Sequence, residues 1–248
     1  MQDFISGFRY SFNGFGLILK PGVRVYVLIP LLINTVLFAG VITYGAHLLN
    51  EFTESFLTGW WEWLRWLLWP VFVIVVLTIV FFCFSIIANL IASPFNGFLA
   101  EAAEIHITGN VQQEFTGLGQ LPGEIKKAIV SESRKFLYFI VRAVPLIILF
   151  FIPLVNFAAP FLWFLFGAWM LTLEYVDFPM GNHGILFPEI RKILKSRRQL
   201  AFGFGLGVML LTLIPVINFI ALPVAVCGAT KMWAERLSTL QVAGTTNI

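Results

Sequence analysis

The chain has 248 residues, of which 59% are hydrophobic and only 12% are charged. A soluble domain carries about 25% charged residues, and a core of this size cannot hide 27 Phe and 8 Trp side chains, so lipid must replace water over much of the surface. The net charge of +3 does not indicate a nucleic-acid partner, and the chain lacks the ten-residue alternating segments of a membrane β-barrel. The sequence therefore predicts an all-α integral membrane protein with one membrane domain, residues 1–248.

Residues 1–20 are predicted to form an amphipathic helix at the membrane interface. Four phenylalanines recur at helical spacing and share one face: Phe4, Phe8, Phe12 and Phe15. An apolar face of this kind rests in the headgroup region while the polar face meets water. The glycines of this segment lower its helix propensity, because glycine loses more conformational freedom than alanine.

The next five residues, Lys20-Pro21-Gly22-Val23-Arg24, form a candidate anion site. Pro21 and Gly22 permit a chain reversal, after which a new helix begins with free backbone N–H groups and a partial positive charge. Arg24 adds a full charge and a planar fork of donors, which suits a tetrahedral anion. An arginine that snorkels to the interface from a helix start explains the same residues, so two interpretations stay open.

Long charge-free stretches predict two full membrane spans, because a charge at the bilayer centre is costly. The stretches after Arg24 and Arg65 predict spans over residues 25–50 and 67–92. An interfacial belt of tryptophans accompanies the second: Trp60, Trp61, Trp63, Trp66 and Trp69. Ser93-Pro94-Phe95-Asn96-Gly97 then interrupts the apolar stretch, and we expect the spanning helix to end there.

A polar stripe runs along the second predicted span at helical spacing. Its members are Thr78, Ser85, Asn89, Ser93 and Asn96. Polar groups in hydrocarbon need partners, so the stripe either packs against other helices or lines a wet path. In the second case the translocation path contains Ser85, Asn89 and Asn96, followed by Glu101 and Glu104 near the cytoplasmic end. The Asn amides offer donors that bind an anion without holding it too tightly.

Two further apolar segments, 143–173 and 199–230, are predicted to be partly penetrating helical hairpins. Each carries the motif Ile-Pro-x-(Val/Ile)-Asn-Phe, at 152–157 and 214–219. Each is too short for two full spans and a turn, and a central Pro-Asn pair disfavours one straight span. Hairpins with arms of roughly 10–15 residues remain. The matching motifs indicate an internal repeat, or simply two turns made by Pro-Asn pairs.

Charge asymmetry predicts the orientation. The loop from Asn50 to Arg65 is acidic, whereas almost all basic residues fall on the other side, which the positive-inside rule makes cytoplasmic. Glu101 and Glu104 on that side would repel an anion unless they pair with bases such as Arg134 or Arg142. Basic runs beside the membrane segments serve as topology signals and contact anionic lipids: Lys126-Lys127, Arg134-Lys135 and Arg191–Arg198.

The sequence contains few groups for catalysis, and we expect neither an enzyme nor a cofactor nor a metal site. The phosphate-loop motif Gly-x4-Gly-Lys-(Ser/Thr) does not occur, which excludes ATP hydrolysis by that means. Gly203-Phe-Gly205-Leu-Gly207 lies in an apolar helix and indicates close helix packing, not dinucleotide binding.

Several blocks resemble the CysZ family of bacterial sulfate permeases, in order and spacing along almost the whole chain. They are Lys20–Arg24, Ile29–Asn34, Ile87–Glu101, Leu162–Met170, Asn182-His183 with Phe187 and Glu189, and Leu222–Thr230. The resemblance implies ATP-independent sulfate uptake across the inner membrane for cysteine biosynthesis. It also implies a multi-pass homo-oligomer with two long spanning helices and two partly penetrating hairpins.

The sulfate site of that family lies at a Gly-hydrophobic-Arg motif, which corresponds here to Gly22, Val23 and Arg24. Relatives often have a second arginine next, where this chain has Val25, so the resemblance implies a site with one guanidinium or with a cation from elsewhere. The alternative function is a membrane accessory or scaffold protein that binds sulfate without transporting it. A membrane-embedded enzyme is a third hypothesis, but no nucleophile–base pair favours it.

Overall fold

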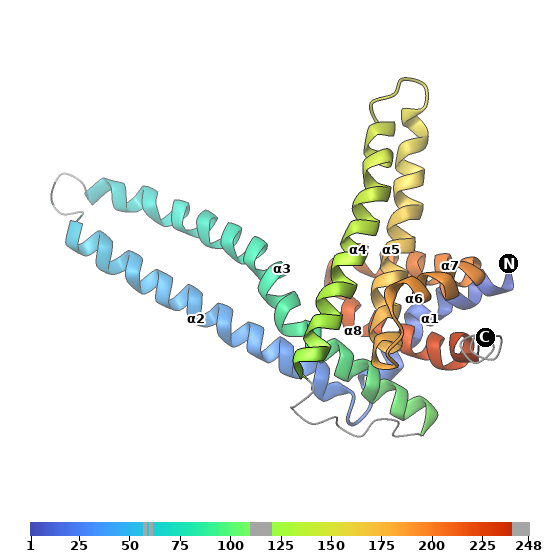
Figure 1. Cartoon of the computed structure of the whole chain (residues 1–248). Coiled ribbons are helices and arrows are strands. Elements are labelled where there is room, and N and C mark those ends of the chain that lie inside the picture. The colour runs from blue at the N-terminus through green and yellow to red at the C-terminus, as the bar shows by residue number, and fades with distance from the viewer. Residues whose placement is uncertain (57–58, 60–61, 110–120, 240–248) are drawn as a thin grey trace. The chain divides into compact units, whose positions relative to one another are not determined.

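The computed structural model describes residues 1–56, 59, 62–109 and 121–239, without the side chains of residues 79–94, 121–132 and a few others. Every regular element in these ranges is helical, which confirms the all-α class (Figure 1). The helices are α1 (Gln2–Ile18), α2 (Arg24–Phe56), α3 (Glu62–Thr108), α4 (Leu121–Leu149), α5 (Ala159–Asn182), α6 (Phe187–Ser196), α7 (Arg198–Leu213) and α8 (Pro215–Met232). A 3₁₀ helix, Asn156–Ala158, precedes α5, and a π-helical segment, Trp233–Leu237, follows α8.

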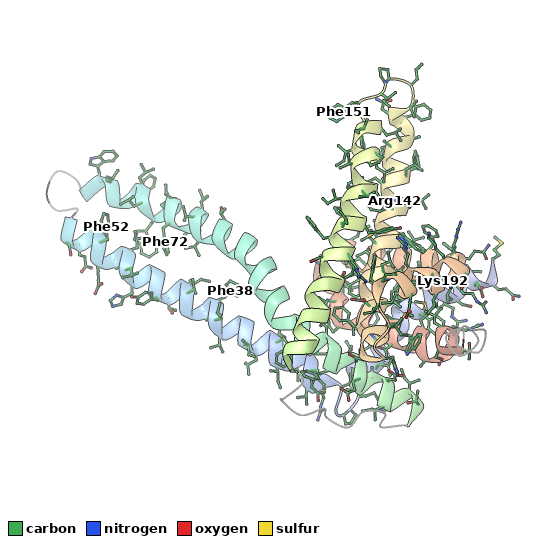
Figure 2. All side chains as sticks on the ribbon, viewed as in Figure 1. Phe38, Phe52, Phe72, Arg142, Phe151 and Lys192 are labelled. Atoms are coloured by element: carbon green, nitrogen blue, oxygen red, sulfur yellow. The ribbon has the colours of Figure 1, made fainter. Side chains whose placement is uncertain are left out.

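The chain divides into two compact units, Met1–Arg24 with Asn96–Ile248, and Val25–Phe95. The second unit consists of α2 and the first part of α3, and the Phe72 ring lies against Gly45 of α2 (Figure 2). Within the described ranges, two segments are long and apolar enough to cross a membrane, Arg24–Ser55 and Asn156–Asn182. Only 6% of the most apolar window of the first is buried, so its side chains face outwards, as those of a lipid-exposed helix do.

α3 does not end at Ser93-Pro94, as the sequence predicted, but continues to Thr108. A proline inside a helix removes one N–H donor and crowds the carbonyl four residues earlier, which weakens a helix without always ending it. The residues that follow are held by burial, since Leu99, Ala100 and Ala103 are buried. The predicted interruption instead coincides with the boundary between the two units.

α1 packs through its small residues, not through its phenylalanine face. Its buried residues are Gly7, Tyr10, Ser11, Gly14 and Ile18. A Cβ added at Gly7 would collide with the backbone of Leu200 in α7, and one at Gly14 with the backbone of Val224 in α8. Phe4 and Phe12 lie exposed on the other side. The glycines, which the sequence suggested would only weaken this helix, are what allows its backbone to approach its neighbours.

The three glycines of α7 also bring backbones together, which confirms the predicted close packing. A Cβ at Gly203 would meet the backbone of Phe4 in α1, one at Gly207 would meet Ser11 in α1, and one at Gly205 would meet the Ala168 carbonyl of α5. α7 is therefore the central contact of the unit that contains α1, α5, α7 and α8.

α4 and α5 run beside each other and turn at the first Pro-Asn motif, as predicted (Figure 1). α4 ends at Leu149 and α5 begins at Ala159, with Leu154 between them at a φ of 70°. The arms are longer than predicted: α4 has 29 residues and α5 has 24, against roughly 10–15 expected.

α5 continues past the end of the charge-free stretch because its first acidic residues find a cation. The Lys135 ammonium of α4 lies 3.3 Å from a Glu174 oxygen and 2.9 Å from an Asp177 oxygen. Paired carboxylates can follow an apolar helix without the desolvation penalty of isolated ones. A gap between charges therefore underestimates the length of a helix when the flanking charges are paired.

The second hairpin, α7 and α8, turns earlier than its motif predicted. The break is at Ile214, and Pro215 occupies the first turn of α8, where a missing N–H costs nothing. Asn218, the expected tip, is already helical, and its N–H donates to the Ile214 carbonyl at 2.8 Å. The two motifs thus match in sequence but not in conformation, so the predicted structural repeat is wrong at these turns.

Candidate functional site

The Lys20–Arg24 turn joins α1 to α2 and holds the residues predicted to bind an anion. The Lys20 carbonyl accepts hydrogen bonds from the N–H groups of Val23 at 3.2 Å and Arg24 at 3.1 Å. Gly22 has a φ of 86°, a left-handed conformation that favours glycine. The Val23 side chain is 1% exposed and anchors the turn against the unit that α1 belongs to.

The turn presents two cationic side chains to solvent. Lys20 and Arg24 are both exposed, and in the described part of the chain no carboxylate forms an ion pair with either. The N–H groups of Val23 and Arg24 were expected to be free, but the turn itself uses them. The ammonium and the guanidinium are therefore the main donors that this turn can offer an anion.

A second polar cluster links the C-terminal part of α3 to the end of α5. The side-chain amide of Asn182 donates to the Gly97 carbonyl at 2.8 Å, next to Asn96, which is buried. One helical turn or two further on, the His183 Nε2 lies 2.8 and 3.0 Å from the two carboxylate oxygens of Glu104. These contacts pin the end of α5 to α3 at two points.

The imidazole of His183 is also held from the other side, because it packs against the Trp233 ring with centroids 5.4 Å apart. The hydrogen bond to Glu104 raises the pKa of His183 above its usual value, and burial opposes this shift. The cluster therefore favours an imidazolium paired with a carboxylate.

The predicted partners of the acidic residues on α3 were wrong. Glu104 pairs with His183 and not with Arg134 or Arg142. Arg142 instead lies over the Tyr138 ring, with its guanidinium carbon 5.4 Å from the ring centroid. A histidine was not considered because it lies 79 residues away in sequence, and only the packing of α3 against the end of α5 brings it close.

The polar stripe is described only at its two ends. The Thr78 hydroxyl donates to the Ile74 carbonyl of its own helix at 2.8 Å, and Asn96 is buried. The side chains of Ser85 and Asn89 lie outside the described residues. Glu101 is partly exposed, one turn before Glu104. The path hypothesis thus stays a prediction, with Asn96 and Glu104 placed close to α5 residues.

Sequence reasoning missed the ion cluster of Lys135, Glu174 and Asp177. The Lys135 residue is 5% exposed, although a basic run beside a membrane segment suggested a lipid-facing side chain. The signal was available, since two acidic residues three positions apart lie on one face at the end of an apolar helix and require a cation there.

A family model described as "Sulfate transporter CysZ/Etoposide-induced protein 2.4" matches residues 10–223. The chain belongs to this family. Two relatives from Pseudomonas fluorescens are 43% and 44% identical to it over 234 residues, which is 93% of this chain and 94% and 92% of theirs. A third, from Pectobacterium atrosepticum, is 40% identical over 239 residues, 95% of this chain and 86% of its own. All three are named sulfate transporter CysZ.

Membership of the CysZ family confirms the resemblance seen in the sequence blocks. The matched residues include the Lys20–Arg24 turn, Glu104 and His183. The two clusters described above therefore belong to the shared family region and not to an extension of this chain.

The His183–Glu104 pair predicts a pH-dependent stability. A histidine whose folded pKa is raised contributes stability that is fully present below its unfolded pKa of about 6.5 and is lost as pH rises through the folded pKa. The melting temperature of the wild type should therefore exceed that of His183→Gln most at pH 6 (about 1–2 kcal/mol) and least at pH 9. Melting in detergent at both pH values measures the difference. A constant difference would mean that only neutral packing on Trp233 was lost.

Proposed function

We propose that this chain is a permease that carries sulfate across the bacterial inner membrane without ATP hydrolysis and supplies cysteine biosynthesis. Three relatives that align with at least 93% of the chain are named sulfate transporters. The sequence has no phosphate-loop motif, which agrees with uptake that is not driven by ATP hydrolysis. We further propose a homo-oligomer of multi-pass chains.

The observation that carries the proposal is the Lys20–Arg24 turn. It places two solvent-facing cations, one helical turn apart, beside a glycine with a positive φ. A sulfate dianion can accept from the fork of Arg24 and from the ammonium of Lys20 at once. Lys20 then supplies the second cation that Val25 does not, and Gly22 and Val23 shape the turn that sets both side chains.

The membrane arrangement is proposed from charge and from exposed apolar surface. α2 over residues 25–50 and α3 over residues 67–92 span the bilayer, and the segments 143–173 and 199–230 enter it partway. The side chains at the tip of α4 and α5 support this, since Phe151, Leu154 and Phe157 are at least 72% exposed. The acidic loop after α2 is then periplasmic and the basic α6 cytoplasmic.

We propose that sulfate moves along α3, past Ser85, Asn89 and Asn96, towards Glu101 and Glu104. The bond between Glu104 and His183 supports this, because an imidazolium neutralises a carboxylate that would otherwise repel the ion. Opening that pair would change the charge at the cytoplasmic end of the path.

Arg24→Ala is expected to weaken sulfate binding by about 1.5–3 kcal/mol, the size of a lost charge-assisted hydrogen bond. Calorimetry on the purified protein measures it. Arg24→Lys should recover part of the affinity, because the ammonium keeps the charge and loses the fork. Arg9→Ala is the matched control, since Arg9 is an exposed arginine of α1 outside the turn. Equal losses at positions 9 and 24 would show a general charge effect and remove the site.

Flux into vesicles that contain only this purified protein separates a permease from an accessory protein. We expect labelled sulfate to accumulate inside, and to do so without ATP. The wild type should transport faster than Arg24→Ala at low sulfate concentration, because the variant fills its site less often. Normal sulfate binding without any flux would refute the permease and favour the binding-only alternative.

A further inference from the structure

Two arginines from different helices converge on one tyrosine at the base of the α4–α5 arm. The guanidinium carbon of Arg142 in α4 lies 5.4 Å from the centroid of the Tyr138 ring, and that of Arg191 in α6 lies 5.2 Å from it. The ring is itself fixed, since Phe187 packs edge-on at 5.7 Å and the Trp169 indole N–H donates to the Tyr138 hydroxyl at 3.2 Å. The two cations therefore share a rigid aromatic support.

The charge of this pair is not balanced by the chain itself. In the described part of the chain neither guanidinium forms an ion pair with a carboxylate. The nearest acidic residues along α5, Glu174 and Asp177, are bound to Lys135. Like charges held near one another repel, so the arrangement is stabilised by an anion between them. The Tyr138 hydroxyl accepts from Trp169, which leaves its own proton as a third donor.

The position of the pair along the chain indicates which anion is present. Arg142 is the last charge before the stretch 143–173, and Figure 2 shows it at the base of the arm whose tip carries Phe151. Exposed apolar side chains of α4 adjoin it: Val141, Val144, Ile147 and Ile148. Trp169 and Tyr138 lie at the same level, as aromatic residues do at a membrane–water boundary.

α6 places the second arginine at this boundary. It buries Phe187, Ile190 and Leu194 and exposes Lys192 and Lys195, as an amphipathic helix on an anionic membrane surface does. The phosphates of lipid headgroups are the anions that lie at this depth, directly above acyl chains that can cover the apolar residues of α4.

We infer that Arg142, Arg191 and the Tyr138 hydroxyl bind the phosphate of an anionic phospholipid, whose acyl chains lie along α4. A phosphate and a free sulfate share the tetrahedral oxyanion chemistry that two guanidiniums recognise. The apolar surface beside the pair distinguishes the two, because only a lipid uses both. This site is separate from the Lys20–Arg24 turn and does not depend on the proposed transport activity.

The test is binding of phosphatidylglycerol to the full-length protein in detergent, measured by native mass spectrometry, with phosphatidylethanolamine as the neutral comparison and inorganic sulfate as the free anion. We expect Arg142→Gln/Arg191→Gln to weaken phosphatidylglycerol binding at least about tenfold. Lys192→Gln/Lys195→Gln removes the same charge from exposed positions of α6 and should change it much less. Tyr138→Phe keeps the aromatic support, loses the donor and should fall between them.

Three results would overturn the inference. Equal weakening in the two double variants would show a diffuse charge effect. Unchanged phosphatidylglycerol binding together with lost sulfate binding in the arginine variant would assign the pair to the free ion. If the arginine variant does not fold, the comparison rests on Tyr138→Phe, and wild-type binding of phosphatidylglycerol in that variant would also contradict the site.

Discussion

Gly14→Ala is expected to destabilise the protein by about 3 kcal/mol or more, whereas Gly16→Ala, two residues further along α1, should leave it unchanged or slightly more stable. A Cβ at position 14 would collide with the backbone of Val224 in α8, and backbone cannot move aside as a flexible side chain can. A Cβ at position 16 meets nothing within 4 Å. The two helices must therefore separate in the first variant only.

The pair of variants controls for helix propensity, because both replace a glycine in the same helix and gain the same roughly 0.5–1 kcal/mol from alanine. Thermal unfolding in detergent, followed by circular dichroism and by recovery of the monodisperse peak, measures both. If Gly14→Ala melts with Gly16→Ala, α1 does not pack on α8 through this face.

The helices were predictable from the sequence, but their buried faces were not. The phenylalanine pattern of α1 predicted a helix correctly, and yet Phe4 and Phe12 are exposed while Gly7 and Gly14 are buried. In water, a periodic apolar face marks the side that packs on a core. In lipid, a large apolar residue is stable on either side, so close packing is marked by small residues instead.

The candidate sites were predictable where they are local in sequence. The Lys20–Arg24 turn needs only neighbouring residues, and the sequence located its reversal and its exposed arginine. The Glu104–His183 and Tyr138–Arg191 contacts join helices far apart in the chain, and no local pattern specifies which helices meet. The early break at Ile214 was missed because Pro can begin a helix as readily as it ends one.

Lys135→Met is expected to destabilise the protein by about 3–5 kcal/mol, the cost of breaking a buried ion pair by removing one partner. Methionine keeps most of the side-chain length, so little packing is lost and the effect reports the ammonium. The Asp177 side chain is only 17% exposed and cannot be rehydrated easily, so it accounts for most of this cost. The Glu174 side chain is 49% exposed, and its pair adds little because solvent screens it.

The matched control is Lys195→Met, the same change at an exposed position of α6, which should alter stability by no more than about 0.5 kcal/mol. The double variant Lys135→Met/Asp177→Asn should recover about 1–3 kcal/mol of the loss, since the remaining amide carries no charge. Thermal and denaturant unfolding of the four proteins in one detergent measures the coupling. A Lys135→Met variant as stable as Lys195→Met would show that α4 and α5 are held by apolar contacts alone, such as the stacked rings of Phe139 and Phe166. Because Lys135 lies one helical turn before Tyr138, loss of the ion cluster should also displace the aromatic support of Arg142.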